Sequence, residues 1–519
     1  MNYLNQKAPP IREERLKACE AFGGSASCLV RGSKIGCLAQ TSRSFVQSSG
    51  CQFTLSLAII ATLQDSVIIL HGPLGCGIGT SMMFNGILKI NQTARGIPPR
   101  GVQTVTTNLT ETDVISGGEP KLRQTILEVD KQYKPRAIFI VSSCVPAIIG
   151  DDIDLVASEL QGQVSARLLT MHCEGFKTKI QATAYDAVYH AILRGLFDID
   201  NDTGLRTNPS VPVSPTPRGP DYEERRKKTV NLLNVASMSL LDEIELRRLL
   251  TALGLNVNVY PCYSKPDDFV KATDAAVSVS ICPTHDDYFL RHLEELYGVP
   301  AVIGTIPIGL GNTRKWLLDV ARFFGIEQKA LQLIEAEESA VREALAPVIA
   351  PLKGKTVFVC AGEFRAAAAA VQFEQDYGMK LVGVRAFHYD AFAEEIFASL
   401  PRRDDVPVNI APWQPFEQSN LLRRLKPDLF VGHVGGNVWA AKDGFASIPI
   451  FSPSNAYMGY KGAFDMGTRI ERTLRNPSFN RNISKHVSLP YQDRWYDDSP
   501  FKYIRQEAAL AAQAPEPAV

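Results

Sequence analysis

Three cysteines of this chain stand where thiolates could hold a metal cluster. Cys51 opens the stretch CQFTLSLAIIATLQDSVIILHGPLGC, and Cys76 closes it inside the glycine-rich turn HGPLGCG. Cys144 ends a second apolar run, AIFIVSSC, and is followed by VPAIIGDD. The iron of an iron–sulfur cluster needs rigidly held, shielded thiolates, and neighbouring glycines let backbone N–H groups approach the sulfides. We therefore predict that these three thiolates hold an iron–sulfur cluster.

The alternative for any one of the ten cysteines is a small buried hydrophobic residue. No CxxC pair or Cys/His zinc spacing occurs, so a structural zinc site is not indicated. Four cysteines end strand-like runs, where an open parallel sheet places its ligand-binding residues. They are Cys76, Cys144, Cys173 and Cys282. Because of this position, a ligand role and a purely structural role are equally favoured for these four cysteines.

Further candidates lie beside other predicted strand ends. Cys282, in VSICPTHDDYFLRHLEELYG, is followed by Pro283. We expect this proline to end the strand and expose the thiol, so Cys282 is a candidate metal ligand. His433, in VGHVGGN, also ends a strand; a ligand or substrate role fits it, although a structural histidine is the commoner case. The GKT of residues 354–356 lacks the upstream glycine of a phosphate loop and precedes a strand, so it is interpreted as a turn. In GDD, Asp151 or Asp152 is expected to cap a helix.

Short apolar runs rich in β-branched residues alternate with amphipathic helices along the chain. VIIL precedes the glycine-rich turn, AIFIVSSC precedes DDIDLVASEL, and KTVFVCAG precedes EFRAAAAAVQFEQDYG. This alternation is typical of parallel sheets with helices on both faces. We therefore predict an α/β fold of three Rossmann-like domains, each a parallel sheet flanked by helices.

The expected domains are separated by changes in composition. Residues 201–220 carry five prolines and almost no large apolar side chain, which indicates a linker or a long surface loop. The expected boundaries are 1–45 for an N-terminal extension, 46–215 for the first Rossmann-like domain with the three cysteines, 216–335 for the second with Cys282, 336–475 for the third, and 476–519 for a C-terminal tail without regular structure.

The overall composition excludes several functional classes. Lysine and arginine number 55 and aspartate and glutamate also number 55, so no global field points to nucleic acid or an anionic membrane. No apolar run approaches the roughly 18 residues of a membrane span, and the N-terminus is polar and charged rather than a secretory signal. We expect a cytoplasmic protein, in which disulfides are rare.

The ordered motifs resemble those of a known family. The order of Cys51, HGPLGCG, NLTETDVISGGEPKL, SSCVPAIIGDDI and HCEGFKTKIQATAYDA, with Cys282 upstream of LEELYGVP, is similar to the α-type subunit of nitrogenase component 1 and its relatives. The resemblance covers about residues 45–475. It implies three Rossmann-like domains with clusters between domains and at the subunit interface. It also implies an α2β2 assembly with a homologous β subunit and an ATP-dependent [4Fe-4S] reductase homodimer as electron donor.

The resemblance also assigns cofactors to individual residues. Cys51, Cys76 and Cys144 match the α-side ligands of the P-cluster, an [8Fe-7S] cluster that the β subunit would share. Cys282 matches the single cysteine at one end of the active-site cofactor, so a second large iron–sulfur cofactor, iron-only or with an unknown heterometal, is implied there. Gln181 matches a glutamine beside that cofactor.

Departures from the family pattern decide the expected reaction. Tyr185 stands where nitrogenase has the histidine that supports substrate protonation, and Phe84 and Ile59 replace an arginine beside the cofactor and a valine that gates access to it. The family's second cofactor ligand is a histidine, but the corresponding segment here, residues 448–462 (IPIFSPSNAYMGYKG), contains none. Arg365 matches a cofactor-facing arginine.

These departures favour an apolar pocket for a small organic sulfur substrate over dinitrogen. The chain is most similar to the methylthio-alkane reductase group, which cleaves C–S bonds to release methanethiol and small hydrocarbons. Two alternatives remain: a scaffold for nitrogenase cofactor assembly and the α subunit of an alternative nitrogenase. The expected catalytic residues are Gln181, Tyr185, His433 and Arg365, with His388 as a further candidate proton donor.

Overall fold

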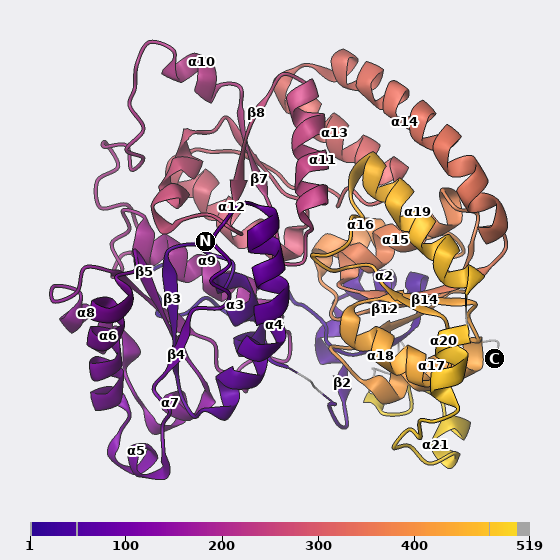
Figure 1. The fold of residues 1–519 in the computed structure, drawn as a ribbon, viewed down its shortest axis with the longest axis horizontal. Coiled ribbons are helices and arrows are strands. Elements are labelled where there is room, and N and C mark those ends of the chain that lie inside the picture. Colours follow the sequence, from indigo (N-terminus) through magenta and orange to yellow (C-terminus); the bar gives the residue numbers. More distant parts are fainter. Residues whose placement is uncertain (1–2, 48–49, 477, 506–519) are drawn as a thin grey trace. The chain divides into compact units, whose positions relative to one another are not determined.

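A computed structural model describes residues 3–47, 50–476 and 478–505 (Figure 1). The chain forms two compact units, which are described separately. The first unit contains residues 3–12, 50–236 and 254–303, and the second contains residues 13–47, 237–253, 304–476 and 478–505. No helix in these described segments is long and apolar enough to cross a membrane.

The first unit contains two parallel sheets of four strands each. The first sheet has the order β4-β3-β5-β6 and the second has the order β10-β9-β7-β8. The strands are β3 (Ser66–His71), β4 (Thr104–Thr106), β5 (Ala137–Ser142), β6 (Arg167–His172), β7 (Thr229–Leu233), β8 (Asn256–Tyr260), β9 (Val277–Val279) and β10 (Ala301–Val302). Helices connect successive strands, as parallel pairing requires.

Both faces of the first sheet are buried because its central strands are apolar on both sides. Val67 and Ile69 of β3 pack toward α6 (Glu119–Tyr133) and α8 (Ile153–Leu160). Ile68 of β3, one residue out of phase, packs toward α3 (Gln52–Ile60) and α9 (Thr183–Leu196). The period of two along β3 therefore divides the core of the first unit into two layers.

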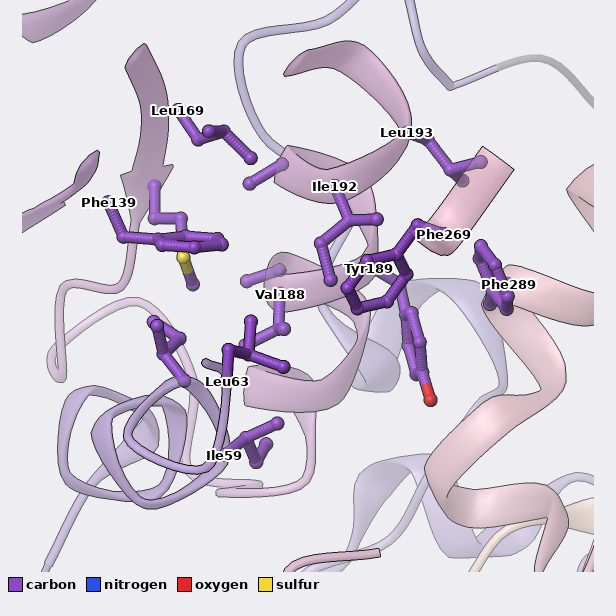
Figure 2. Packing of buried hydrophobic residues seen from close by; sticks show 14 of the residues in the cluster. Ile59, Leu63, Phe139, Leu169, Val188, Tyr189, Ile192, Leu193, Phe269 and Phe289 are labelled. Carbon is purple, nitrogen blue, oxygen red and sulfur yellow. The ribbon is translucent and has the colours of Figure 1, made fainter. Parts of the chain in front are cut away.

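The larger layer joins the two sheets of the first unit through α9 and α12 (Pro283–Tyr297). Tyr189 of α9 stacks on Phe289 of α12 with ring centroids 4.8 Å apart. Ile192 and Phe269 lie beside this aromatic pair (Figure 2). A continuous apolar core therefore holds the two strand-end regions of this unit in a fixed geometry.

A buried ion pair ties the N-terminal segment to the same layer. The Arg12 guanidinium lies 2.7 Å from the Asp186 carboxylate of α9 and 3.6 Å from the Asp287 carboxylate of α12. It also donates to the carbonyl of Thr284. All three charged side chains are fully buried. Removing the arginine alone would therefore leave two buried carboxylates without a counter-charge.

The second unit is built on one six-stranded sheet of order β1-β13-β12-β11-β14-β15. All of its pairs are parallel except β1 with β13. The strands are β1 (Phe22–Ser25), β11 (Thr356–Ala361), β12 (Lys380–Ala386), β13 (Pro407–Ile410), β14 (Leu429–Gly432) and β15 (Ser447–Pro449). Its helices are α2 (Ala26–Lys34), α11 (Leu240–Ala252), α13 (Leu310–Phe324), α14 (Glu327–Ile349), α15 (Glu363–Gln375), α16 (Glu394–Ala398), α17 (Pro415–Leu425), α18 (Val434–Lys442) and α19 (Gly459–Arg475).

The predicted α/β class, with parallel sheets flanked by helices, is confirmed. The domain boundaries stay predictions. The expectation of an irregular tail is wrong for its described part. There α20 (Ser478–Ser484), α21 (Arg494–Asp497) and β16 (Ile504–Arg505) form, and β16 pairs with β2 (Ser42–Arg43). Backbone pairing across more than 460 positions of sequence decides this structure, and no local pattern in the tail predicts it.

Candidate metal centre

The three predicted cluster cysteines all stand at the N-terminal ends of helices. Cys51 is the N-cap of α3, Cys76 is the second residue of α4 (Gly75–Ala94), and Cys144 is the first residue of α7 (Cys144–Ile149). A helix N-terminus carries a partial positive charge and unpaired N–H groups, which favour a thiolate. The same local structure therefore prepares each sulfur as a metal ligand.

Neighbouring strands bring two of these helices to one edge of the first sheet. β3 leads into α4, β5 leads into α7, and the two strands pair in parallel with His71 opposite Ser142. Cys76 and Cys144 therefore follow the carboxyl ends of two neighbouring strands. Between them Gly72 passes so close to Ser143 that a Cβ on Gly72 would lie 2.0 Å from the serine Oγ. Only glycine allows this approach.

The loop after β6 completes the site through Gly175. A Cβ on Gly175 would lie 2.9 Å from the Sγ of Cys51 and 3.7 Å from the Sγ of Cys144. Both sulfurs therefore converge on the space that a side chain at this position would fill. The sequence HCEGFK contained this signal as a glycine two residues beyond a strand-end cysteine, but only the fold shows what the glycine faces.

The electrostatics of the site reflect the close approach of the thiols. Partial burial raises the pKa of the Cys76 thiol, and the nearby Ser143 hydroxyl lowers it. Negative charge on Cys144 and Cys51 would raise it further. A cysteine binds metal as the thiolate, so a bound metal would supply the positive charge that holds these three sulfurs deprotonated side by side.

The donor set fits an iron–sulfur cluster. It consists of three cysteine sulfurs on rigid helix ends with a glycine-lined space between them. Cys76 is exposed, and Cys51 and Cys144 are partly buried, so the thiols open onto the surface of the first unit. Large apolar side chains are exposed on the elements that carry the site. They are Leu74, Met82, Ile148 and Phe176.

Buried polar pairs support the loops on either side of the thiols. The His71 imidazole contacts Asp151 at 2.9 Å and Thr107 at 3.1 Å, and burial lowers the pKa of His71. Asp151 also accepts a hydrogen bond from the Gly118 N–H at 2.9 Å. Asp152 caps α8 by accepting from the Leu155 N–H, which confirms the prediction that one of these two aspartates caps a helix.

A second support lies next to Cys173. His172 contacts Asp154 at 2.7 Å and Glu174 at 3.3 Å. Burial by itself would lower the pKa of His172, but the hydrogen bonds and charges of the two carboxylates raise it to about 9. The resulting imidazolium fixes the start of the loop that carries Gly175.

Cys282 occupies a different environment in the same unit. It is the N-cap of α12, three residues after the last residue of β9, and only 3% of it is exposed, so the expectation that Pro283 exposes the thiol is wrong. Ser280 donates to the Asp286 carboxylate at 2.7 Å, which fastens the turn around Cys282. His285, three residues into the helix, packs against Tyr185 with ring centroids 4.3 Å apart. The structure thus brings Tyr185 to the helix that begins at Cys282.

Gln181 lies closer to the first cysteine site than the sequence indicated. Its amide donates to the Gly50 carbonyl at 2.7 Å, directly beside Cys51. The predicted role beside the second cofactor stays a prediction.

Arg365, His433 and Tyr457 come together at the carboxyl edge of the sheet in the second unit. The Arg365 guanidinium carbon lies 6.0 Å from the centre of the Tyr457 ring. Burial and the positive charge of Arg365 lower the pKa of His433 to about 4, so this imidazole is neutral at pH 7. The predicted role of His433 as a proton donor therefore requires the neutral N–H, since an imidazolium is disfavoured there.

His388 belongs to a buried polar group in the second unit. Its Nε2 lies 3.2 Å from Glu363 and 3.9 Å from Asp390. These residues follow β11 and β12, so they also lie at the carboxyl edge of the sheet.

The segment without histidine is held in place by Asp242, a residue that sequence reasoning missed. The Asp242 carboxylate accepts from the N–H groups of Tyr457 at 2.7 Å and Met458 at 2.8 Å, and from the hydroxyl of Ser239 at 2.8 Å. The Tyr457 hydroxyl donates to the Ser237 carbonyl at 3.2 Å. The SxxD pattern signalled a capping box, but its second role in anchoring residues 448–462 depends on tertiary contact.

Comparisons with known proteins identify the family of the chain. The family described as nitrogenase component 1 type oxidoreductase matches residues 51–475. The nitrogenase iron-molybdenum cofactor biosynthesis protein NifE of Methanococcus maripaludis is 24% identical over 91% of this chain and 94% of its own length. The nitrogenase molybdenum-iron protein alpha chain of Methanosarcina barkeri is 25% identical over 83% of this chain and 86% of its own.

A solved structure shares the fold. The structure "Nitrogenase Cp1 at pH 5" superposes with a TM-score of 0.68 at 19% identity, covering 87% of this chain and 93% of that one. At this identity the likeness concerns the fold alone.

Proposed function

Because the chain belongs to the nitrogenase component 1 type oxidoreductase family, we propose that it is the α-type subunit of an ATP-dependent iron–sulfur reductase that cleaves the C–S bond of methylthio-alkanes. The single observation that carries the redox assignment is the convergence of the Cys51 and Cys144 sulfurs on the space beside Gly175, with Cys76 close enough for their charges to act on its thiol. That arrangement suits an [8Fe-7S] cluster of the P-cluster type. Electrons would come from a [4Fe-4S] reductase homodimer.

The surface around the three thiols supports sharing of this cluster with a homologous β subunit. An exposed cysteine leaves part of a cluster open to solvent, and clusters are shielded in working enzymes. The exposed apolar residues Leu74, Ile148 and Phe176 would be covered by the same partner. An α2β2 heterotetramer satisfies both requirements.

Cys282 is the proposed ligand of a second, larger iron–sulfur cofactor. When bound, that cofactor would supply the electrons and the iron to which a sulfur substrate binds. The chain itself offers one buried thiol on the rigid end of α12, with the Tyr185 phenol and the His285 ring packed beside it. These side chains would exclude water and orient the substrate near the thiol.

The lack of histidine in residues 448–462 supports an organic substrate over dinitrogen. In its place the chain presents the buried rings of Phe451 and Tyr457, which pack edge-on with centroids 5.5 Å apart. Arg365 adds one positive charge, and His433 adds a neutral imidazole. An apolar wall with few polar groups suits a small thioether.

The proposed reaction balances with two electrons and two protons. In R–S–CH3 the R–S bond breaks, the carbon of R gains a hydrogen to give R–H, and the sulfur leaves as methanethiol. Tyr185 and the neutral His433 are the chain's candidates for delivering protons; Gln181 and Arg365 would position the substrate.

The test is a turnover assay on the complex purified without oxygen, with its reductase and ATP. Release of methanethiol and the matching hydrocarbon from a panel of methylthio-alkanes is expected. The absence of methanethiol with every member of the panel, from a complex with full iron content, would overturn the proposal. Reduction of dinitrogen or acetylene as the main activity would instead favour the α subunit of an alternative nitrogenase.

A second candidate, a scaffold for nitrogenase cofactor assembly, is favoured by the likeness to NifE over 91% of the chain. A scaffold hands its cofactor on and does not turn over. Quantitative transfer of iron from the Cys282 site to an apo-nitrogenase would support it, whereas repeated turnover with retained metal would exclude it.

A further inference from the structure

Arg385 is a buried charge in the second unit whose counter-charge is not among its contacts. It lies on β12 with only 2% exposed, opposite Cys360 of β11 in the parallel register. Its Nη1 donates to the Gln418 Oε1 at 2.7 Å. Within the described part of the chain, its Nε and Nη2 have no nitrogen or oxygen partner, and the neighbouring Cys360 thiol offers the guanidinium only a weak sulfur contact.

The nearest carboxylate is already committed to another arginine. Glu417 accepts from Arg43 at 2.6 and 3.0 Å and from Asn409 at 2.7 Å. Gln418, the neutral partner of Arg385, is itself fixed by donating to the Gly436 carbonyl at 2.8 Å. Arginine stays protonated in proteins, so burial leaves this guanidinium with a large uncompensated cost.

The unpaired side of Arg385 lines a small cavity. Three aromatic side chains form part of the remaining wall, and the cavity has a volume of about 10 Å³ for the centre of a water-sized guest. The other lining residues are Cys360, Phe387, Trp413, Pro415, Gln418, Gly436 and Trp439. A cavity of this size admits one small guest and excludes a carboxylate side chain or an organic acid.

We propose that this cavity binds one monovalent, chloride-sized anion as the counter-ion of Arg385. The ion would accept hydrogen bonds from Nε and Nη2 of the guanidinium. Burial raises the pKa of the Cys360 thiol despite the adjacent arginine, so the thiol is neutral and leaves the counter-charge to the ion. The Phe387 ring also packs against the His433 ring, with centroids 6.1 Å apart, so the anion would stabilise the packing next to His433.

The test replaces chloride by bromide in the full-length complex and locates bromide by anomalous diffraction. A peak within hydrogen-bonding distance of Nε or Nη2 is expected, and it should vanish in Arg385→Met. Water density at this position, in crystals that show bromide elsewhere, would overturn the proposal. The wild-type experiment decides the question even if Arg385→Met does not fold.

A solution measurement separates the anion from the thiolate as counter-charge. Replacing gluconate by chloride at constant ionic strength should raise the thermal midpoint saturably in wild type and in Cys360→Ala, because gluconate is too large for the cavity. The control Arg314→Met removes a partly exposed arginine and should keep the response. A chloride response confined to Cys360→Ala would show that the thiolate is the counter-charge and would refute the anion site.

Discussion

Replacing Gly175 by alanine tests the cluster site without touching a ligand. The added Cβ would lie 2.9 Å from both the Cβ and the Sγ of Cys51, whereas ordinary contacts begin at about 3.4 Å. Cys51 is the N-cap of α3 and cannot retreat without moving the helix end. The sulfur is therefore expected to shift by roughly half an ångström or more, at a cost of about 1–3 kcal/mol of overpacking.

Cluster retention should suffer far more than stability. A shift of a ligand or its support typically weakens metal binding about 10–100-fold. We expect Gly175→Ala to lose the iron and acid-labile sulfide of the three-cysteine site and its redox signal, while the far-ultraviolet circular dichroism stays unchanged. Iron and sulfide analysis of complexes purified without oxygen measures this directly.

Gly162→Ala is the matched control. No atom lies within 4 Å of a Cβ at Gly162, so this change should alter neither iron content nor stability by more than about 0.5 kcal/mol. If Gly175→Ala kept wild-type iron, sulfide and redox signal, the glycine would be a packing residue only, and the inference that the thiols converge on this space would be refuted.

Three further predictions follow from the first unit. Cys282→Ala should remove the iron of the second cofactor and leave the three-cysteine cluster. The control Cys262→Ala changes an equally buried cysteine and should leave both clusters. Metal analysis of the two variants measures this, and equal iron loss from both would contradict the assignment. Arg12→Met should lower the free energy of unfolding by about 3–5 kcal/mol because two buried carboxylates lose their cation, against about 0–1 kcal/mol for the exposed Lys7→Met; similar losses from both would contradict the argument. The pKa of His172 is raised to about 9 in the folded protein, against 6.5 in the unfolded chain. The imidazolium therefore contributes on the order of 2–3 kcal/mol to the free energy of unfolding below pH 6.5, and this contribution is lost as the pH rises through 9. The stability difference between wild type and His172→Gln should shrink across that pH window.

The sequence could predict the cysteine sites because their signal is local. A strand-like run followed by a glycine-rich turn places Cys76 and Cys144 at the carboxyl edge of a parallel sheet, whatever the rest of the chain does. The structure confirms the class of fold, and it places Cys76 and Cys144 at helix N-termini that follow these strands. The same reasoning located Cys282 at the end of β9.

Features that depend on contacts between distant segments could not be predicted from the sequence. β1, with the sequence FGGS, has no strand pattern of its own and becomes a strand because the edge of β13 offers it antiparallel hydrogen bonds. Gly175 resembles any loop glycine until the fold brings Cys51 and Cys144 to it. Arg385 resembles a surface arginine in a strand and is in fact buried.

The anchoring of Tyr457 offers a test between catalyst and scaffold. A scaffold must release its cofactor, so if residues 448–462 lie beside the cofactor, as the family resemblance implies, they should open at low cost in a scaffold. Here a fully buried carboxylate, Asp242, whose pKa burial raises to about 6, accepts from the backbone of Tyr457 and Met458. Opening the segment would leave that carboxylate without these donors in a dry interior, which costs about 1–3 kcal/mol or more for a charged group.

A rigid wall is what a catalyst needs to keep its substrate oriented through turnover. Asp242→Asn should loosen the segment, because an amide accepts from the two N–H groups more weakly than a carboxylate does. If the chain is a catalyst, this substitution should lower turnover while metal content is retained. If it is a scaffold, the same substitution should instead speed the transfer of iron to an apo-acceptor, so the two rates measured on one variant separate the two functions.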